Sequence, residues 1–273
     1  MNDKNEIWNE DKEEKVLSET FLKLEAIVNV KTSEIEKYEC LVRHNDYIPP
    51  VILKNISNER LFLKQLKDIS KLVKEKDIKV SINIDNNVLK SQRVYDELSK
   101  YPKNILKNIE FEILETNIDL KSLEIFSKRI ENLGIKVNID DFGSEEQTME
   151  RVKDIHDIVG KKLKSIKLDA SVVKGYCEDN PKMIKNVKEV RDYALKNNIT
   201  IIAEHIENIN KFEKIKEVSD YVQGYMFDSL YSNLKNIDSA LDNSQKNAKM
   251  KLKNHLLKDK PMEEKTKKKS KRQ

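Results

Sequence analysis

The sequence lacks several features that would assign it to a particular class of protein. Only two of its 273 residues are cysteine, Cys40 and Cys177, and their spacing matches neither a zinc site nor a disulfide framework. No run of about 18 apolar residues occurs, so no transmembrane helix is predicted. The first residues, MNDKNEIWNEDKEEK, lack the apolar core of a signal peptide. These absences predict the reducing cytoplasm as the compartment.

Glycine is also scarce, and the charges are numerous but mixed. The five glycines and the hydrophobic content of 38% are typical of a soluble, helix-rich α/β protein. The net charge of +4 conceals an asymmetry, because residues 246–273 hold twelve basic and three acidic side chains. The remaining 40 basic and 45 acidic residues give −5. The basic tail is predicted to be disordered and to contact anionic surfaces such as nucleic acid or lipid. The alternative is a lysine-rich end that only aids solubility.

Apolar runs alternate with amphipathic segments through most of the chain. Strands are expected at 21–30, 34–43, 78–84, 109–115, 135–141, 163–169, 199–207 and 221–227. Helices are expected between them at 58–76, 87–101, 117–134, 146–159, 181–198 and 208–218, and a further helix begins near residue 232. This alternation predicts a TIM-like (β/α) barrel. The first two strands have no helix between them, so they are expected to form an antiparallel pair.

This reading divides the chain into four segments. Residues 1–17 form a charged N-terminal segment and 18–235 the barrel domain. A C-terminal helix is expected at 236–257, and 258–273 is the basic disordered tail.

The stretch VNIDDFGSE, 137–145, places two aspartates side by side at the end of an expected strand. Neighbouring carboxylates resist joint ionisation unless a cation lies between them. Asp140 and Asp141 are therefore candidate metal ligands, although aspartate before a glycine turn is also common in ordinary loops.

Other strands carry acidic, amide or basic residues within or beside their apolar runs. They are Glu39, Arg43, Asn83, Glu112, Glu115, Lys167, Asp169, Glu204, Glu207 and Gln223. Chemistry in a barrel of this kind is found at the C-terminal ends of the strands, and buried charges require partners or metal. Five carboxylates that converge with one lysine favour a hard-metal site that holds two ions of Mg²⁺ or Mn²⁺.

In this order the motifs resemble the EAL family of cyclic diguanylate (c-di-GMP) phosphodiesterases, over about residues 18–235. The matching segments are ECLVR (39–43), SIN (81–83), EILE (112–115), DDFG (140–143), KLD (167–169), AEHIE (203–207) and QGY (223–225). The resemblance implies hydrolysis of c-di-GMP to linear pGpG. It leaves open a homodimer.

The resemblance also implies roles for single residues. The metal ligands would be Glu39, Asn83, Glu112, Asp140 and Asp141, with Asp140 bridging two ions. Glu204 and Lys167 would position the attacking water. Arg43 would pair with a substrate phosphate, and Gln223 would face the substrate. Glu115, Glu207 and Asp169 would hold loops and ligands from behind.

Four departures from the family pattern keep a second reading open. SEEQTME replaces the family's Thr-Gly-Tyr-Ser-Ser after DDFG, Glu25 stands where a glutamine is usual, His205 replaces a glycine, and Cys40 replaces an alanine. The alternatives to an active enzyme are a catalytically impaired c-di-GMP receptor and a protein-interaction scaffold.

Overall fold

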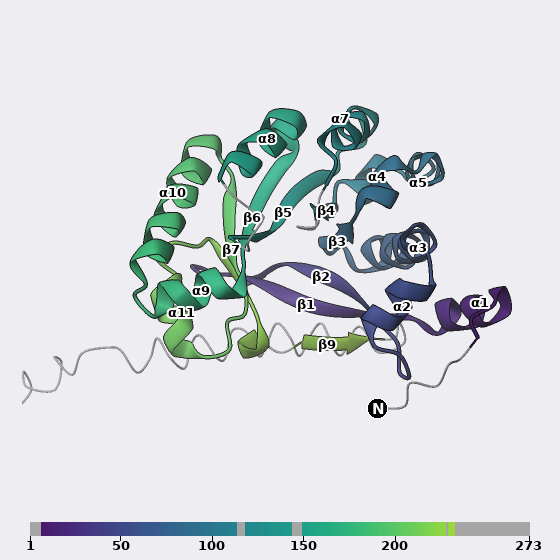
Figure 1. Ribbon diagram of the computed structural model, residues 1–273, viewed down its shortest axis with the longest axis horizontal. Coiled ribbons are helices and arrows are strands. Elements are labelled where there is room, and N and C mark those ends of the chain that lie inside the picture. The colour runs from purple at the N-terminus through teal and green to yellow at the C-terminus, as the bar shows by residue number, and fades with distance from the viewer. Residues whose placement is uncertain (1–6, 114–117, 144–148, 228, 233–273) are drawn as a thin grey trace, which may run out of the picture.

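The computed structural model describes residues 7–113, 118–143, 149–227 and 229–232 (Figure 1). The predicted C-terminal helix at 236–257, the basic tail, Glu115 and the altered loop at 144–148 lie outside these ranges. None of the helices in the described ranges is both long and apolar enough to cross a membrane.

Eight strands close into a barrel, as predicted. They are β1 (Phe21–Asn29), β2 (Ile35–Arg43), β3 (Val80–Ile84), β4 (Ile109–Ile113), β5 (Lys136–Phe142), β6 (Leu163–Leu168), β7 (Thr200–Ala203) and β8 (Tyr221–Gln223). Neighbouring strands from β2 to β8 run parallel in chain order. β1 closes the barrel by pairing with both β2 and β8, and it is antiparallel to each of them.

A ninth strand, β9 (Ser229–Ser232), was not predicted. It pairs antiparallel with the first half of β1, from Leu22 to Glu25, while β8 pairs with the second half of β1, from Ile27 to Asn29. Ser232 still belongs to this strand, so the helix expected from about 232 cannot begin before residue 233, and its remaining length lies outside the described residues.

Helices cover the outside of the barrel (Figure 1). They are α1 (Glu10–Glu19), α2 (Pro49–Asn55), α3 (Asn58–Lys76), α4 (Asn86–Lys90), α5 (Gln92–Leu98), α6 (Lys103–Leu106), α7 (Leu120–Arg129), α8 (Met149–Val159), α9 (Ala170–Cys177), α10 (Pro181–Asn197) and α11 (Ile209–Ile215), with the 3₁₀ turns η1 (Gly160–Lys162) and η2 (Tyr225–Phe227). Apolar residues of α3 at helical spacing, among them Leu66, Ile69 and Leu72, are buried as the sequence predicts.

The helix expected at 87–101 is in fact two helices, α4 and α5. Ser91 has an extended backbone (φ −73°, ψ 118°) and ends the first helix. Its hydroxyl accepts a hydrogen bond from the Val94 amide at 3.0 Å and so caps the second. The strand expected at 199–207 is also shorter, since β7 ends at Ala203.

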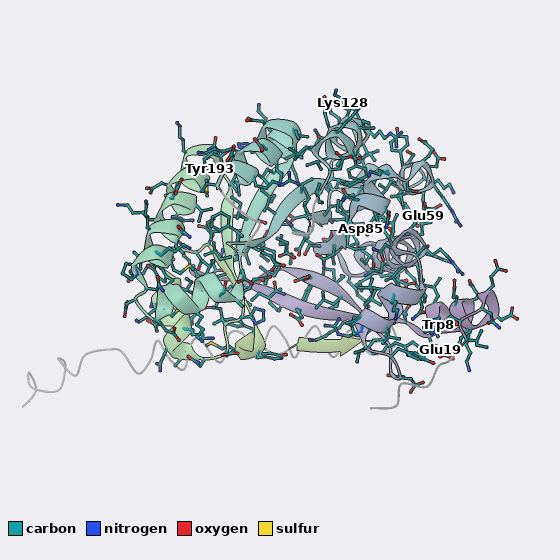
Figure 2. All side chains as sticks on the ribbon, in the orientation of Figure 1. Trp8, Glu19, Glu59, Asp85, Lys128 and Tyr193 are labelled. Carbon is teal, nitrogen blue, oxygen red and sulfur yellow. The ribbon has the colours of Figure 1, made fainter. Side chains whose placement is uncertain are left out.

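The charged N-terminal segment contains a helix that composition alone did not indicate. The side chain of Asn9 caps α1 by accepting a hydrogen bond from the Lys12 amide at 2.9 Å. Val16 and Leu17 then pack with Ile52 and Ile56 in a small separate core. The Trp8 ring meets the edge of the Tyr47 ring at 5.5 Å. Trp8, which precedes α1, and Glu19, its last residue, are labelled in Figure 2, where this helix lies beside α2 at the edge of the molecule.

Gly224, directly after β8, allows a close approach of two backbones. Its φ of +149° is unusual for other residues, and a Cβ there would lie 2.3 Å from the backbone nitrogen of Ile206. Gly160 also has a positive φ, +57°, but a Cβ there would meet nothing within 4 Å. An alanine at Gly224 would meet both backbone strain and steric overlap, whereas an alanine at Gly160 would meet backbone strain alone.

We expect Gly224→Ala to lower the free energy of unfolding by about 3 kcal/mol, because strain and overlap act together. Gly160→Ala should lower it by only about 1 kcal/mol, since only strain applies. Urea unfolding followed by circular dichroism measures both. Equal losses in the two variants would contradict the steric argument.

Candidate metal centre

The ammonium group of Lys167 is the centre of the site. Lys167 lies on β6 in the barrel interior, and its side chain is 1% exposed. Its Nζ lies 2.6 Å from Glu204 Oε1, 2.8 Å from Glu112 Oε2, 2.9 Å from Asp140 Oδ1 and 3.1 Å from Glu39 Oε2. Four carboxylates from four other positions along the barrel wall thus converge on one cation.

A β-bulge explains how Asp140 and Asp141 both reach this region. Residues in a regular strand point alternately to opposite faces. Between Ile139 and Phe142 the pairing of β5 with β6 shifts register, and Asp141 takes a left-handed backbone with φ 56°. Aspartate tolerates this conformation better than most residues. A bulge of this kind re-aims a side chain, and carboxylate oxygens of Asp140, Asp141 and Glu204 lie within 4.8 Å of one another.

The carboxylates form two groups that share one member. Glu39, Glu112 and Asp140 make one group of three ligand atoms within 4.8 Å, and Asp140, Asp141 and Glu204 make the other. Asp140 is the member that the two groups have in common, and its bridging of two ions stays a prediction. Glu204 falls in the second group, next to the position expected for a second ion.

Several buried oxygen atoms in this cluster lack hydrogen-bond donors. Asn83 Oδ1, Glu112 Oε1 and Asp140 Oδ1 accept no hydrogen bond from any described residue, although Asp140 Oδ1 lies at ion-pair distance from Lys167. An unpaired buried acceptor is costly. Oxygen atoms of carboxylates and amides are the ligands that Mg²⁺ and Mn²⁺ prefer. The residues present therefore fit a hard divalent cation.

The charge of the cluster supports the same conclusion. Four ionised carboxylates and one ammonium give a formal charge of −3 in a buried place. Burial is the largest effect and raises the pKa of Glu112, Asp140 and Glu204 to about 7 each, and neighbouring carboxylates add to it. Burial also tends to raise the pKa of Glu39. The charge of Lys167 and the hydrogen bonds from Gln223, Lys167 and Asn83 outweigh burial and hold this pKa below its usual value.

Two amide side chains orient Glu39. Asn83 Nδ2 donates to Glu39 Oε1 at 3.2 Å, and Gln223 Nε2 donates to Glu39 Oε2 at 2.7 Å. Gln223 also donates to Glu25 Oε2 at 3.2 Å. The negative charge of Glu25, one of the departures from the family pattern, is paired with the ammonium of Lys23 at 2.5 Å.

Two cavities are lined by candidate site residues, and carboxylates of the cluster line only the first of them. One, of about 220 Å³, is lined by Glu39, Asp140, Lys167, Glu204 and Gln223, together with Glu25, Ala26, His205, Gly224 and Tyr225. The other, of about 260 Å³, is mainly apolar and includes Arg43 and Asn83 in its wall. Arg43 and Gln223, the two predicted substrate-binding residues, therefore lie on different cavities. The Arg43 guanidinium donates to the carbonyl of Val42 at 2.8 Å.

Asp169, Glu207 and Glu115 were predicted to hold the loops and the metal ligands without binding metal themselves. The structure gives each of them a different position. Asp169 caps α9 by accepting from the Ser171 amide at 2.7 Å, and its charge raises the pKa of Asp141 after the larger effect of burial. Glu207 is half exposed and pairs with Lys211 at 2.9 Å on the surface, so the structure does not bring it to the carboxylate cluster. Glu115 lies outside the described residues.

Sequence reasoning missed a second set of polar residues inside the barrel. Lys37, Glu110, Asn138 and Ser165 are all buried, and hydrogen bonds join them. Each stands two residues before a predicted site residue, so the alternation of side chains along a strand was the signal that could have found them.

Comparison with known proteins gives the same family as the motifs. The model of the EAL domain matches residues 13–229. A cyclic di-GMP phosphodiesterase, PdeA of Borreliella burgdorferi, is 34% identical over 174 residues, which is 60% of this chain and 24% of that protein. The chain thus spans about a quarter of the length of this relative.

Solved structures share the fold. An EAL domain protein of Listeria monocytogenes superposes with a TM-score of 0.67 at 21% identity, over 82% of this chain and 95% of that one. BlrP1 of Klebsiella pneumoniae, in a complex with manganese and cyclic di-GMP, gives a TM-score of 0.62 at 19% identity, over 77% of this chain and 55% of that one.

The raised pKa values of the carboxylates predict how stability depends on pH without metal. A carboxyl with a higher pKa in the folded state than in the unfolded chain favours folding at low pH. For Glu112, Asp140 and Glu204 this contribution is complete below their ordinary values of 4.5, 3.8 and 4.5, and it is lost as the pH rises through about 7.

We therefore expect the melting temperature in chelator to fall between pH 6 and pH 8, by at least about 3 °C, the shift that about 1 kcal/mol produces in a domain of this size. Mg²⁺ or Mn²⁺ should raise the melting temperature more at pH 8 than at pH 6, because the ions replace protons. Differential scanning fluorimetry measures both, and Glu112→Gln should flatten the slope seen in chelator. A melting temperature that rises with pH in chelator would disprove this account of the cluster.

Proposed function

Because the chain belongs to the EAL domain family, we propose that it is a metal-dependent phosphodiesterase that hydrolyses cyclic di-GMP to linear pGpG in the cytoplasm. The observation that carries the proposal is the pair of three-carboxylate groups that share Asp140. Two metal positions about one bridging ligand suit an in-line attack of water on a phosphodiester. The relative named as a cyclic di-GMP phosphodiesterase supports this choice of substrate.

Five residues would hold the ions: Glu39, Asn83, Glu112, Asp140 and Asp141. When bound, Mg²⁺ or Mn²⁺ would lower the pKa of a water molecule and neutralise the phosphate. Asn83 and Gln223 fix the orientation of Glu39 through their hydrogen bonds. Lys167 holds four of the carboxylates together through its ion pairs.

Glu204 would position the attacking water and take a proton from it. Its carboxylate lines the cavity beside Asp140 and is held by Lys167 at 2.6 Å. A buried carboxyl with a raised pKa is suited to accept a proton near neutral pH. The Arg43 fork on the neighbouring cavity suits a phosphate oxygen of the substrate.

The alternative is a catalytically impaired receptor or a protein-interaction scaffold. Glu25 favours it, because this acid lines the cavity that a dianionic dinucleotide would enter. The Lys23 partner reduces that repulsion. Homodimer formation and contact of the tail at 258–273 with anionic surfaces remain predictions that go with either function.

We expect the purified protein to convert cyclic di-GMP to pGpG with Mg²⁺ or Mn²⁺, and to lose this activity with chelator or Ca²⁺. Ca²⁺ fits oxygen ligands but takes looser coordination and activates water poorly. Chromatography of the products measures turnover, and calorimetry with cyclic di-GMP measures binding. Binding without any linear product would favour the receptor.

We expect Glu39→Ala to reduce turnover at least about 100-fold, roughly 2.7 kcal/mol of barrier, because Glu39 supplies one of the three ligand atoms in its carboxylate group. The melting temperature in chelator should change little, since a strand-end ligand contributes more to chemistry than to packing. Glu189→Ala, at an exposed position of α10, is the control and should turn over like the wild type. Near-normal turnover of the Glu39 variant would show that the metal lies elsewhere.

A further inference from the structure

A chain of polar side chains crosses the barrel interior directly below the carboxylate cluster. Its members, which we call the polar layer, are Lys37, Glu110, Asn138 and Ser165, all at most 7% exposed. Lys37 Nζ donates to Glu110 Oε2. Asn138 Nδ2 donates to the same oxygen at 2.9 Å, and Ser165 Oγ donates to Asn138 Oδ1 at 2.6 Å. The layer therefore links β2, β4, β5 and β6.

The same four strands carry the centre of the site. Side chains two residues apart on a strand point to the same face. Each member of the polar layer stands two residues before a site residue, in the pairs Lys37 and Glu39, Glu110 and Glu112, Asn138 and Asp140, and Ser165 and Lys167.

Stability does not account for this layer. Branched apolar side chains usually fill the interior of such a barrel. A buried ion pair such as Lys37 with Glu110 gains little, since the loss of hydration offsets the attraction, and a well-packed apolar pair is often as stable or more so. Hydrogen bonds differ from apolar contacts in one useful respect, which is that they fix direction and distance.

The carboxylates above need such a constraint. When they are ionised, Glu39, Glu112 and Asp140 carry like charges around one lysine and repel one another. The strands that bear them can shift only if the bonds between Lys37 and Glu110, or between Glu110 and Asn138, also break.

We propose that the polar layer is a positioning device that holds the four strand ends at the spacing a divalent cation requires, and so sets the metal affinity of the site. The proposal rests on the metal-dependent function proposed above. Lys37, Glu110, Asn138 and Ser165 are positioning residues that act through the ligands and touch neither metal nor substrate.

Two serines of the barrel interior provide a matched test. Ser165 and Ser81 are 1% and 0% exposed, and each precedes a site residue by two positions. The hydroxyl of Ser165 belongs to the layer, whereas Ser81 Oγ has no hydrogen-bond partner among the described residues. Ser165→Ala should weaken Mn²⁺ binding about threefold, while Ser81→Ala should leave it unchanged.

The stronger variant is Lys37→Met with Glu110→Met, which replaces the ion pair by apolar side chains of similar length. We expect it to weaken Mn²⁺ binding at least about tenfold, the usual effect of losing partners behind metal ligands. Calorimetry with Mn²⁺ measures affinity, and thermal unfolding in chelator measures stability. The Mn²⁺ concentration for half-maximal turnover should rise equally, while kcat at saturating Mn²⁺ should stay within about threefold, since the ligands themselves are intact.

Unchanged Mn²⁺ affinity in the double variant would overturn the proposal, whatever its stability. If the double variant does not fold, the two serine variants decide, and equal affinities of Ser165→Ala and Ser81→Ala would overturn it. Absence of Mn²⁺ binding by the wild type would instead remove the proposed function and, with it, the role of the layer. Normal wild-type binding with unaffected variants would remove the layer's role alone.

Discussion

The site depends on one buried cation, the ammonium of Lys167, which lies within 3.1 Å of oxygen atoms of four carboxylates. Burying that much negative charge is possible only if each carboxylate has a partner. A single ammonium offsets one of the four charges, so protons must neutralise much of the remainder when no metal is bound. The pKa values of Glu112, Asp140 and Glu204 are raised to about 7 because these carboxyls are buried and the positive charge near them is too small to balance them all. With the proposed metal-dependent function, divalent cations would take the place of these protons.

The backbone conformation, and not only the residue types, brings the carboxylates together. Asp140 and Asp141 converge because the bulge in β5 places Asp141 in a left-handed conformation. His205, after Glu204, has a similar backbone with φ 53°. Glycine adopts this conformation without strain, which agrees with the glycine that the family pattern has there. Both unusual residues adjoin acids of the cluster, as is common where a fold stores strain at a functional site.

The barrel and its first antiparallel pair could be predicted because the period of apolar residues changes clearly between strands and helices. The convergence of Glu39, Glu112, Asp140 and Lys167 followed from their places at strand ends. Local chemistry was harder to foresee. The break at Ser91 depends on one hydroxyl, and α1 depends on a small core with residues far along the chain. The polar layer was not predicted, because lysine and glutamate are rarely buried and nothing in their residue types marks Lys37 and Glu110 as interior.

The pairing of β1 also determines the order in which the two edges of this strand can be covered during folding. β1 is the first strand to be made, and β2 can pair with it at once because only a short turn separates them. Its other edge waits for β8 and β9, with Ile27 opposite Gln223 and Leu22 opposite Ser232. Pairing across so much sequence is slow. Throughout that interval the growing chain carries an open strand edge, the kind of edge on which other chains can assemble. By pairing with this edge, β8 and β9 therefore prevent other chains from assembling on β1.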